Sequence, residues 1–186
     1  MRKLLLMAVL ATATVGACTT RGTEETAVRR GDEAFAMGNY DEALAEYRLA
    51  VRQGAEDPLV VARVAHTYAT MGRVDDAGDF YEEAASKDPG LVDQAVSDLM
   101  YLARDAQSTD DRFAMATAVE TALRLRAGIG VGTMSLPLAR HYFENGEYGR
   151  ALPFYQKAMA EATDSAPEIV FEVGNAYEEI GDCQHA

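Results

Sequence analysis

The chain is poor in the residue types that carry catalytic or metal chemistry. Its 186 residues include only two cysteines and three histidines. The histidines, His66, His141 and His185, lack metal-ligand spacing, and no HExxH or Cys-x-x-Cys pattern occurs. No serine stands in a GxSxG motif. The sequence therefore offers no pattern for a metal site, a cofactor or a catalytic nucleophile, and we expect a protein that is not an enzyme.

Positive charge is also scarce. The chain has 17 lysine and arginine residues against 30 aspartate and glutamate residues, which gives a net charge of −13. Such a surface repels nucleic acid and anionic lipid, so neither is expected as a direct partner. It could attract a basic protein, although acidic charge more often serves solubility alone.

Only the first residues form a long apolar run. This run is Leu4–Val15, and Arg2 and Lys3 precede it. It is too short for a comfortable membrane span, whereas a basic start followed by a short apolar stretch is typical of a secretory signal. We therefore expect residues 1–17 to be a signal peptide.

A cysteine follows this run directly, in the segment Val15-Gly16-Ala17-Cys18. The segment resembles the lipobox of bacterial lipoproteins, and the resemblance implies cleavage before Cys18 and lipidation of its thiol. Because Thr19 is not aspartate, analogy with enteric bacteria implies sorting to the outer membrane, facing the periplasm. The polar residues 18–26 are expected to form a short tether. The alternative is an ordinary cleavable signal with an incidental cysteine.

A period of 34 residues organises the rest of the chain. Small and aromatic residues recur at this offset: Tyr40, Ala43, Tyr47 and Ala50 return as Val74, Ala77, Tyr81 and Ala84, and Gly38 returns as Gly72. A fixed period of this length indicates a helix–turn–helix repeat, whereas an ordinary amphipathic bundle would show helical spacing without the echo. We therefore expect an all-α stack of helix pairs that presents a surface for binding.

Further units follow, with an irregular one between them. A clear unit spans 132–165 and a partial unit spans 166–186. Their matching positions are Ala139, Tyr142, Gly146, Tyr148, Ala151, Tyr155 and Ala158, then Gly174, Tyr177 and Gly181. The spacing of the glycines leaves residues 92–131 as a degenerate unit with about six extra residues.

The degenerate unit still predicts two helices. Apolar spacing favours helices over Val92–Asp105 and from Phe113 to about Leu125, and Thr109 is expected to cap the second. The glycine-rich stretch 128–132 absorbs the extra residues. It lacks the GxGxxG spacing and the lysine and serine of a phosphate-binding loop, so we interpret it as a connector.

The clear units, about 24–57, 58–91 and 132–165, resemble the tetratricopeptide repeat family. Pro89 stands where that family usually has its closing proline. The resemblance implies a right-handed superhelical solenoid over 27–186 that binds proteins on a concave face, lined by the first helix of each unit.

Carried over by position, the candidate residues of this concave face come from four units. They are Arg29, Asp32, Phe35, Arg63, His66, Arg140, Phe143, Phe171 and Asn175, with Ala62 among their neighbours. Units of this family that clamp a chaperone's terminal carboxylate use lysine and asparagine where this chain has Val28 and Asp32. No such clamp is therefore expected.

The repeats and the lipobox together predict a non-enzymatic scaffold or adaptor, whose partners are proteins of a bacterial cell envelope. Its design is similar to that of type IV pilus pilotins, β-barrel assembly lipoproteins and adaptors for peptidoglycan hydrolases. Two alternatives stay open. One is an envelope peptide- or glycan-binding module, with a pocket between units 58–91 and 132–165 rimmed by Tyr68, Arg140 and Tyr142. The other is self-association through exposed repeat ends.

The last unit stops at Ala186, just inside its expected second helix. Its first helix would then lack cover over Val170, Val173 and Tyr177, which predicts a longer chain, a fraying end or pairing with a partner. Cys183 falls in the position of Tyr40, where a side chain faces the contact between helices. We therefore expect a buried thiol there.

Overall fold

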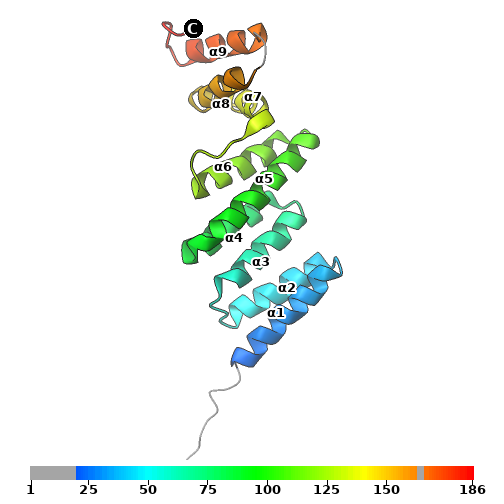
Figure 1. Cartoon of the computed structure of the whole chain (residues 1–186). Coiled ribbons are helices and arrows are strands. Elements are labelled where there is room, and N and C mark those ends of the chain that lie inside the picture. Colours follow the sequence, from blue (N-terminus) through cyan, green and yellow to red (C-terminus); the bar gives the residue numbers. More distant parts are fainter. Residues whose placement is uncertain (1–19, 163–165) are drawn as a thin grey trace, which may run out of the picture.

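The computed structural model describes residues 20–162 and 166–186, which form an elongated stack of paired helices (Figure 1). These described residues contain nine α-helices and two short 3-10 turns. The helices are α1 Thr20–Ala36, α2 Tyr40–Arg52, α3 Pro58–Thr70, α4 Val74–Lys87, α5 Val92–Ser108, α6 Arg112–Leu125, α7 Ser135–Glu144, α8 Tyr148–Glu161 and α9 Pro167–Glu179, and the turns are η1 Pro89–Leu91 and η2 Gly132–Met134. The predicted all-α repeat architecture is confirmed.

The sequence sets the hairpin of each unit locally. Gly38, Gly72 and Gly146 adopt φ of 79°, 71° and 74°, the left-handed conformation that ends a helix without a steric penalty only for glycine. The second helix begins two residues after each glycine. At the start of α3, the Asp57 carboxylate accepts a hydrogen bond from the backbone N–H of Leu59 at 2.9 Å. Each unit therefore carries its own stop and start signals.

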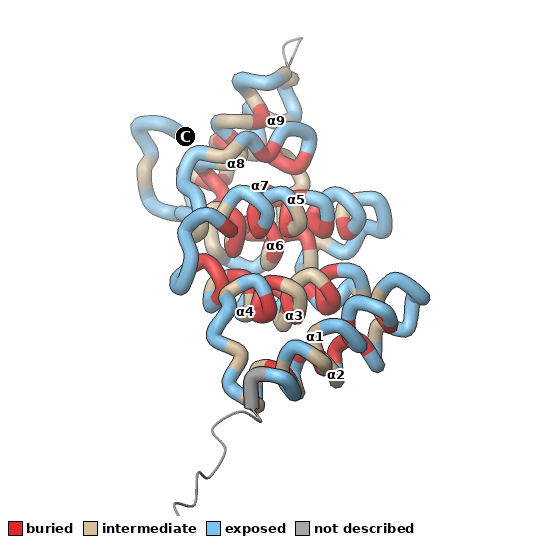
Figure 2. The backbone as a smooth tube through the Cα atoms, turned by 60° about the horizontal axis from the view of Figure 1, so that its bottom comes forward, coloured by how far each residue is buried: buried red, intermediate tan, exposed pale blue. Residues whose placement is uncertain are grey.

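Small residues let the paired helices approach. Ala43, Ala77 and Ala151, the echoed alanines, are fully buried. One closer approach was not predicted: at Gly31 in α1, an added Cβ would lie 2.5 Å from Cε1 of the Tyr47 ring. Buried residues follow the lines along which neighbouring helices meet, and exposed residues cover the outer turns (Figure 2). The main core cluster runs without interruption from α1 to α9, as expected for a solenoid in which neighbours bury each other's faces.

The degenerate unit forms both predicted helices, but its cap is a different residue. The N-cap of α6 is Asp111, whose carboxylate accepts from the N–H of Ala114 at 2.9 Å. The prediction of Thr109 was wrong, because this residue still belongs to the end of α5. Its hydroxyl donates back to the carbonyl of Ala106 at 3.1 Å. Asp110 then turns the chain with a φ of 56°.

The glycine-rich stretch is a connector, as predicted. It follows α6 and leads into η2, with Gly128 at a φ of 79°. Val131 anchors it in the core with 3% exposure. Lys157 of α8 reaches across and donates to the carbonyl of Ile129 at 3.5 Å. The extra residues are thus absorbed between the third and fourth pairs of helices.

The two ends of the repeat array differ from expectation. The signal segment 1–17 and Cys18 lie outside the described residues. From Thr20 onward the predicted tether is already helix α1, whose buried contacts begin at Ala27. Among the described residues, no helix is long and apolar enough to cross a membrane.

At the other end, the prediction of a buried thiol was wrong. Cys183 is exposed, because the residues after Glu179 form turns instead of the expected second helix. Val173 was expected to lack cover but is 6% exposed and packs in the core, whereas Val170 is 58% exposed.

Candidate binding surface

The first helices of successive units lie side by side and carry most of the predicted binding residues. We call the surface formed by α1, α3, α5, α7 and α9 the first-helix face. Side-chain bonds place α1 beside α3, α3 beside α5, and α7 beside α9, whereas α7 follows the preceding pair mainly through contacts with α6. These bonds follow one recurring arrangement, which we call a tyrosine brace. A carboxylate on one first helix pairs with an arginine or histidine on the neighbouring first helix. The tyrosine of the second helix that lies between these two helices directs its hydroxyl to the same carboxylate.

The first tyrosine brace joins α1 to α3. The hydroxyl of Tyr47 in α2 donates to Oδ1 of Asp32 at 2.7 Å. Nε of Arg63 in α3 lies 3.4 Å from the same oxygen. Burial of the Tyr47 ring and its hydrogen bond to Asp32 both raise the pKa of the hydroxyl, which therefore stays a donor.

The second tyrosine brace joins α3 to α5 around Asp98. Tyr81 of α4 donates its hydroxyl to Oδ2 of Asp98, and Nδ1 of His66 lies 2.9 Å from the same oxygen. The bond to Asp98 raises the pKa of His66 above its ordinary value, against the opposing effect of burial. Burial opposes ionisation of Asp98, but the bonds from His66 and Tyr81 outweigh it and lower its pKa. The pair therefore favours an imidazolium facing a carboxylate.

The third tyrosine brace joins α7 to α9. Arg140 binds Glu172 through two bonds, Nη2 to Oε1 at 2.7 Å and Nε to Oε2 at 3.0 Å. Tyr155 of α8 lies beside the same carboxylate, and both residues line one hollow. The bonds from Arg140 hold the pKa of Glu172 below its ordinary value, against burial and with help from Tyr155.

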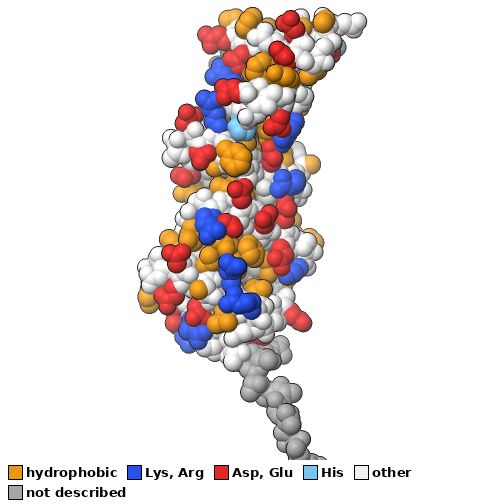
Figure 3. Space-filling view, turned by 180° about the vertical axis from the view of Figure 1, so that it is seen from behind, with side chains coloured by type: hydrophobic (Ala, Val, Ile, Leu, Met, Phe, Trp, Pro, Cys, Tyr) orange, Lys and Arg blue, Asp and Glu red, His pale blue; other side chains and the backbone are white. Residues whose placement is uncertain are grey.

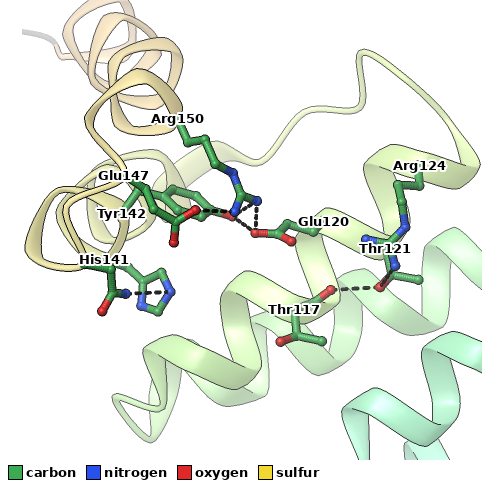
Figure 4. Close-up of polar contacts among 9 residues, drawn as sticks. Thr117, Glu120, Thr121, Arg124, His141, Tyr142, Glu147 and Arg150 are labelled. Atoms are coloured by element: carbon green, nitrogen blue, oxygen red, sulfur yellow. Dashed lines mark hydrogen bonds and ion pairs between the residues drawn. The ribbon is translucent and has the colours of Figure 1, made fainter. Parts of the chain in front are cut away.

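The junction between the third and fourth pairs is built differently. The position in α6 that lies one 34-residue period after Tyr81 is Met115, which is buried and has no hydroxyl to donate. The helices are joined instead through Tyr142, whose hydroxyl donates to Glu120 of α6 (Figure 4). Arg150 of α8 lies over the Tyr142 ring, 4.3 Å from its centroid, and also bonds to Glu120.

Hollows open along the first-helix face between the braces. One, of about 330 Å³, lies between α3 and α5. Its lining includes His66, Thr70, Asp98, Tyr101, Leu102 and Asp105. A second, of about 300 Å³, lies between α7 and α9 and is lined by Arg140, Phe143, Glu144, Tyr155, Glu172 and Asn175. A third, of about 510 Å³, lies where α1 meets the loop before α3. The first two hollows have mixed polar and aromatic linings, whereas the third is lined by polar and aliphatic residues. All three are candidate places for a partner's side chains.

Most of the predicted binding residues already form bonds or ring contacts with neighbouring residues of the same chain. Asp32, Arg63, His66 and Arg140 belong to braces, although the side chains of Arg63, His66 and Arg140 remain 42%, 44% and 42% exposed. Arg29 pairs with Glu33 of its own helix.

Among the aromatic candidates, two rings contact neighbouring residues of the chain and one is largely exposed. The ring of Phe35 lies 5.4 Å from that of His66, and Phe143 contacts Tyr148. Phe171 stays 70% exposed. Asn175 lines the hollow between α7 and α9.

Other placements differ from expectation. Ala62 was expected on the binding face, but it is 4% exposed and packs in the core. Tyr101, 68% exposed on α5, was missed. It lies in the degenerate unit, where the repeat alignment gave no position from which to carry a binding residue.

The pocket expected for a peptide- or glycan-binding module is not formed as proposed. Tyr68 and Tyr142 are 2% and 1% exposed, and each ring stacks on a phenylalanine of its own unit, Tyr68 on Phe80 and Tyr142 on Phe154. Arg140 is engaged by Glu172. The pair α5 and α6 lies between the two units, so these three side chains do not share a rim (Figure 1).

Charge on the surface is mixed. On the face seen in Figure 3, acidic and basic groups lie close beside each other along the stack, with apolar groups between them. Within the described chain, no group of three or more His, Cys, Asp or Glu residues is arranged to hold a metal ion.

Comparison with known proteins agrees with this geometry. Residues 28–92, which cover most of α1 through η1, match the family model of the tetratricopeptide repeat. This segment is similar to tetratricopeptide repeats, and the described helices beyond it are paired and stacked in the same way. No curated protein matches the sequence.

Several solved structures resemble the fold. The crystal structure of MamA protein shares 19% identity, with 88% of this chain and 86% of that chain covered and a TM-score of 0.47. A thermophilic tetratricopeptide repeat protein of Thermus thermophilus shares 21% identity, with 87% and 85% covered and a TM-score of 0.40. BtubC from P. vanneervenii shares 21% identity, with 90% and 87% covered and a TM-score of 0.35.

The match to a tetratricopeptide repeat supports a scaffold for protein–protein interaction, and the first-helix face is its candidate surface. Its units present exposed side chains on a rigid, interlocked framework of helices.

Proposed function

We propose that this tetratricopeptide repeat protein is a lipid-anchored adaptor of a bacterial cell envelope, which holds an envelope protein on its first-helix face. The observation that carries the binding role is the row of hollows between adjacent first helices, each flanked by a brace that fixes the helices in place. A pre-organised surface loses little conformational entropy on binding, which favours recognition of a partner segment.

The anchor in this proposal rests on the first residues of the sequence. Arg2, Lys3, the apolar run and the segment ending in Cys18 have the order of a lipoprotein signal. More than one acyl chain on Cys18 would give stable attachment, because each buried methylene contributes about 0.8 kcal/mol. Since α1 begins at Thr20, the array would start directly at the membrane surface. Thr19 in place of aspartate favours the outer membrane, on its periplasmic side.

The acidic surface sets the orientation in this proposal. A chain with net charge −13 is repelled by anionic headgroups within about a Debye length of the bilayer. From its attachment at the membrane surface, the array would therefore extend away from the bilayer and present its first-helix face to proteins in the periplasm. Pilotin, barrel-assembly and hydrolase-recruiting functions all need this arrangement.

Cross-linking in intact cells tests the proposal. Tagged full-length protein is cross-linked, and the captured proteins are identified by mass spectrometry. Cys18→Ser is expected to leave the precursor unprocessed and to abolish capture at the membrane. Phe171→Ser on the first-helix face is expected to reduce capture, whereas Phe113→Ser, a similarly exposed phenylalanine on α6, should leave it unchanged.

Two results would count against the adaptor role. Capture of only further copies of the chain would indicate self-association. A rise in melting temperature with peptidoglycan fragments would indicate a glycan-binding module, because a ligand at 100 times its Kd stabilises the folded state by about 2.7 kcal/mol. Membrane attachment that survives Cys18→Ser would remove the anchor from the proposal while leaving the binding face in place.

A further inference from the structure

The hollow between α3 and α5 presents an unoccupied aromatic ring beside carboxylates. Tyr101 is 68% exposed, and Asp98 and Asp105 stand three residues before it and four after it on α5. Residues with these spacings share one face of a helix, so the ring and both carboxylates border the same hollow. Asp98 directs Oδ2 to His66 and Tyr81, and no bond within the described chain engages its Oδ1.

The chain builds this combination of groups twice more and fills it each time with an arginine of its own. The guanidinium of Arg150 lies 4.3 Å from the centroid of the Tyr142 ring and bonds to Glu147 at 2.6 Å (Figure 4). The guanidinium of Arg73 lies 4.6 Å from the centroid of the Tyr68 ring. In both cases the arginine lies over a tyrosine ring and also binds a carboxylate, Glu147 for Arg150 and Asp76 for Arg73, so this arrangement recurs in the fold.

No such cation occupies the hollow between α3 and α5. None of the residues that line it is lysine or arginine. The nearby Arg73 is already bound to Asp76 at 2.7 Å, and Arg104 of α5 lines a different hollow, beside Thr133. The imidazole of His66 is committed to Asp98. The hollow therefore combines a ring with the Asp105 carboxylate, for which no basic partner is found among the described residues, and with the Oδ1 atom of Asp98, which His66 leaves free.

We infer that this hollow is the specificity subsite of the array and that it receives an arginine side chain from the bound protein. The guanidinium stacks on the exposed ring of Tyr101 and donates to Asp105 and to the free oxygen of Asp98. The net charge of −13 attracts such a basic segment from a distance. This inference rests on the proposed function and adds the chemistry of the partner segment.

A peptide library tests the subsite independently of the natural partner. Random dodecapeptides displayed on phage are selected on immobilised full-length protein in detergent. Selected sequences are expected to share an arginine. Replacing that arginine by citrulline, which keeps the shape but removes the charge, should weaken binding about tenfold, the loss expected for a charge-assisted hydrogen bond.

Matched variants show whether the loss of binding caused by citrulline arises in the hollow between α3 and α5. In Asp105→Asn the citrulline penalty should fall below about twofold, whereas Asp79→Asn, an equal charge change at an exposed position of α4, should retain the full penalty. Tyr101→Leu should weaken arginine peptides about threefold, and Tyr101→Phe should bind like the wild type, because only the ring is required.

The outcomes separate the two proposals. Selected peptides without a shared basic residue, no binding peptide at all, or a citrulline penalty that Asp105→Asn leaves unchanged would each overturn the arginine subsite. The adaptor role is judged separately, by capture of an envelope protein in cells. A captured partner that binds wild type and Asp105→Asn equally would leave the adaptor standing without this subsite.

Discussion

Substitution of Gly31 by alanine should destabilise the array, although alanine is the better helix former. Gly31 lies inside α1 and faces α2. An added Cβ would lie 2.5 Å from Cε1 and 2.6 Å from Cδ1 of the Tyr47 ring. The ring is 3% exposed, and its hydroxyl is tied to Asp32 at 2.7 Å. It therefore has no open space into which to retreat.

The expected magnitude follows from two opposing terms. Glycine to alanine inside a helix ordinarily stabilises by about 1 kcal/mol. To restore even a tight contact of 3.4 Å, the ring must withdraw by about 0.9 Å. Overpacking of this kind costs about 1–3 kcal/mol, and weakening the hydrogen bond to Asp32 adds about 1 kcal/mol. We expect a net loss of about 1–3 kcal/mol in the free energy of unfolding.

The matched control is Gly149→Ala in α8. That glycine is also helical, and nothing lies within 4 Å of its added Cβ. It should therefore gain about 0.5–1 kcal/mol. Urea denaturation followed by far-ultraviolet circular dichroism measures both variants. The reasoning is refuted if Gly31→Ala is as stable as the wild type. In a Tyr47→Leu background the same substitution should cost less, because the obstructing ring is gone.

Three further predictions concern the braces and the turns. Tyr81→Phe removes the hydroxyl that donates to Asp98 and should lower the free energy of unfolding by about 1–2 kcal/mol in chemical denaturation, whereas an unchanged value would mean that the bond contributes nothing. The stability difference between wild type and His66→Gln should depend on pH. The Asp98 carboxylate raises the pKa of His66 in the folded state. The contribution of protonated His66 to the free energy of unfolding is therefore fully present below its unfolded-state pKa of 6.5, and it is lost as the pH rises through the folded-state pKa. Denaturation curves recorded from pH 5 to about pH 9 check this, and a difference that grows with pH would contradict it. Gly146→Ala should cost about 1 kcal/mol, because φ is 74° at this helix end, and thermal melting should show the loss.

The repeat spacing predicted the helices well because it reports close contacts. Ala43 and Ala77 are buried where two helices cross closely, and only a small side chain fits there. The recurrence of alanine at a 34-residue offset therefore indicates both where the helices lie and which helices pair. In the degenerate unit the echo is lost, yet the apolar spacing alone placed α5 and α6 within a few residues of their bounds. Thr109 and Asp111 are both able to cap, and only the backbone turn at Asp110 decides between them.

The binding surface could be predicted only in outline. Repeat position indicated which face Arg63, His66 and Arg140 occupy, but it did not indicate which neighbours they meet there. Opposite charges or hydrogen-bonding partners about one repeat apart, as in His66 with Asp98 and Arg140 with Glu172, were a signal that could have revealed the braces. Tyr101 gave no such signal, because its exposure depends on how α5 sits against α3.

Met115, buried where the other second helices carry a brace tyrosine, divides the array mechanically. One ion pair at that junction, Arg112 with Glu144, is largely exposed and weakens as salt is added, which leaves the partly buried bond from Tyr142 to Glu120. In a one-dimensional stack each pair of helices contacts only its neighbours. We therefore expect the array to bend first between two arms, α1–α6 and α7–α9, and each arm holds one of the hollows described between first helices. A partner long enough to reach both hollows would fix the angle between the arms and so set the curvature of the whole array.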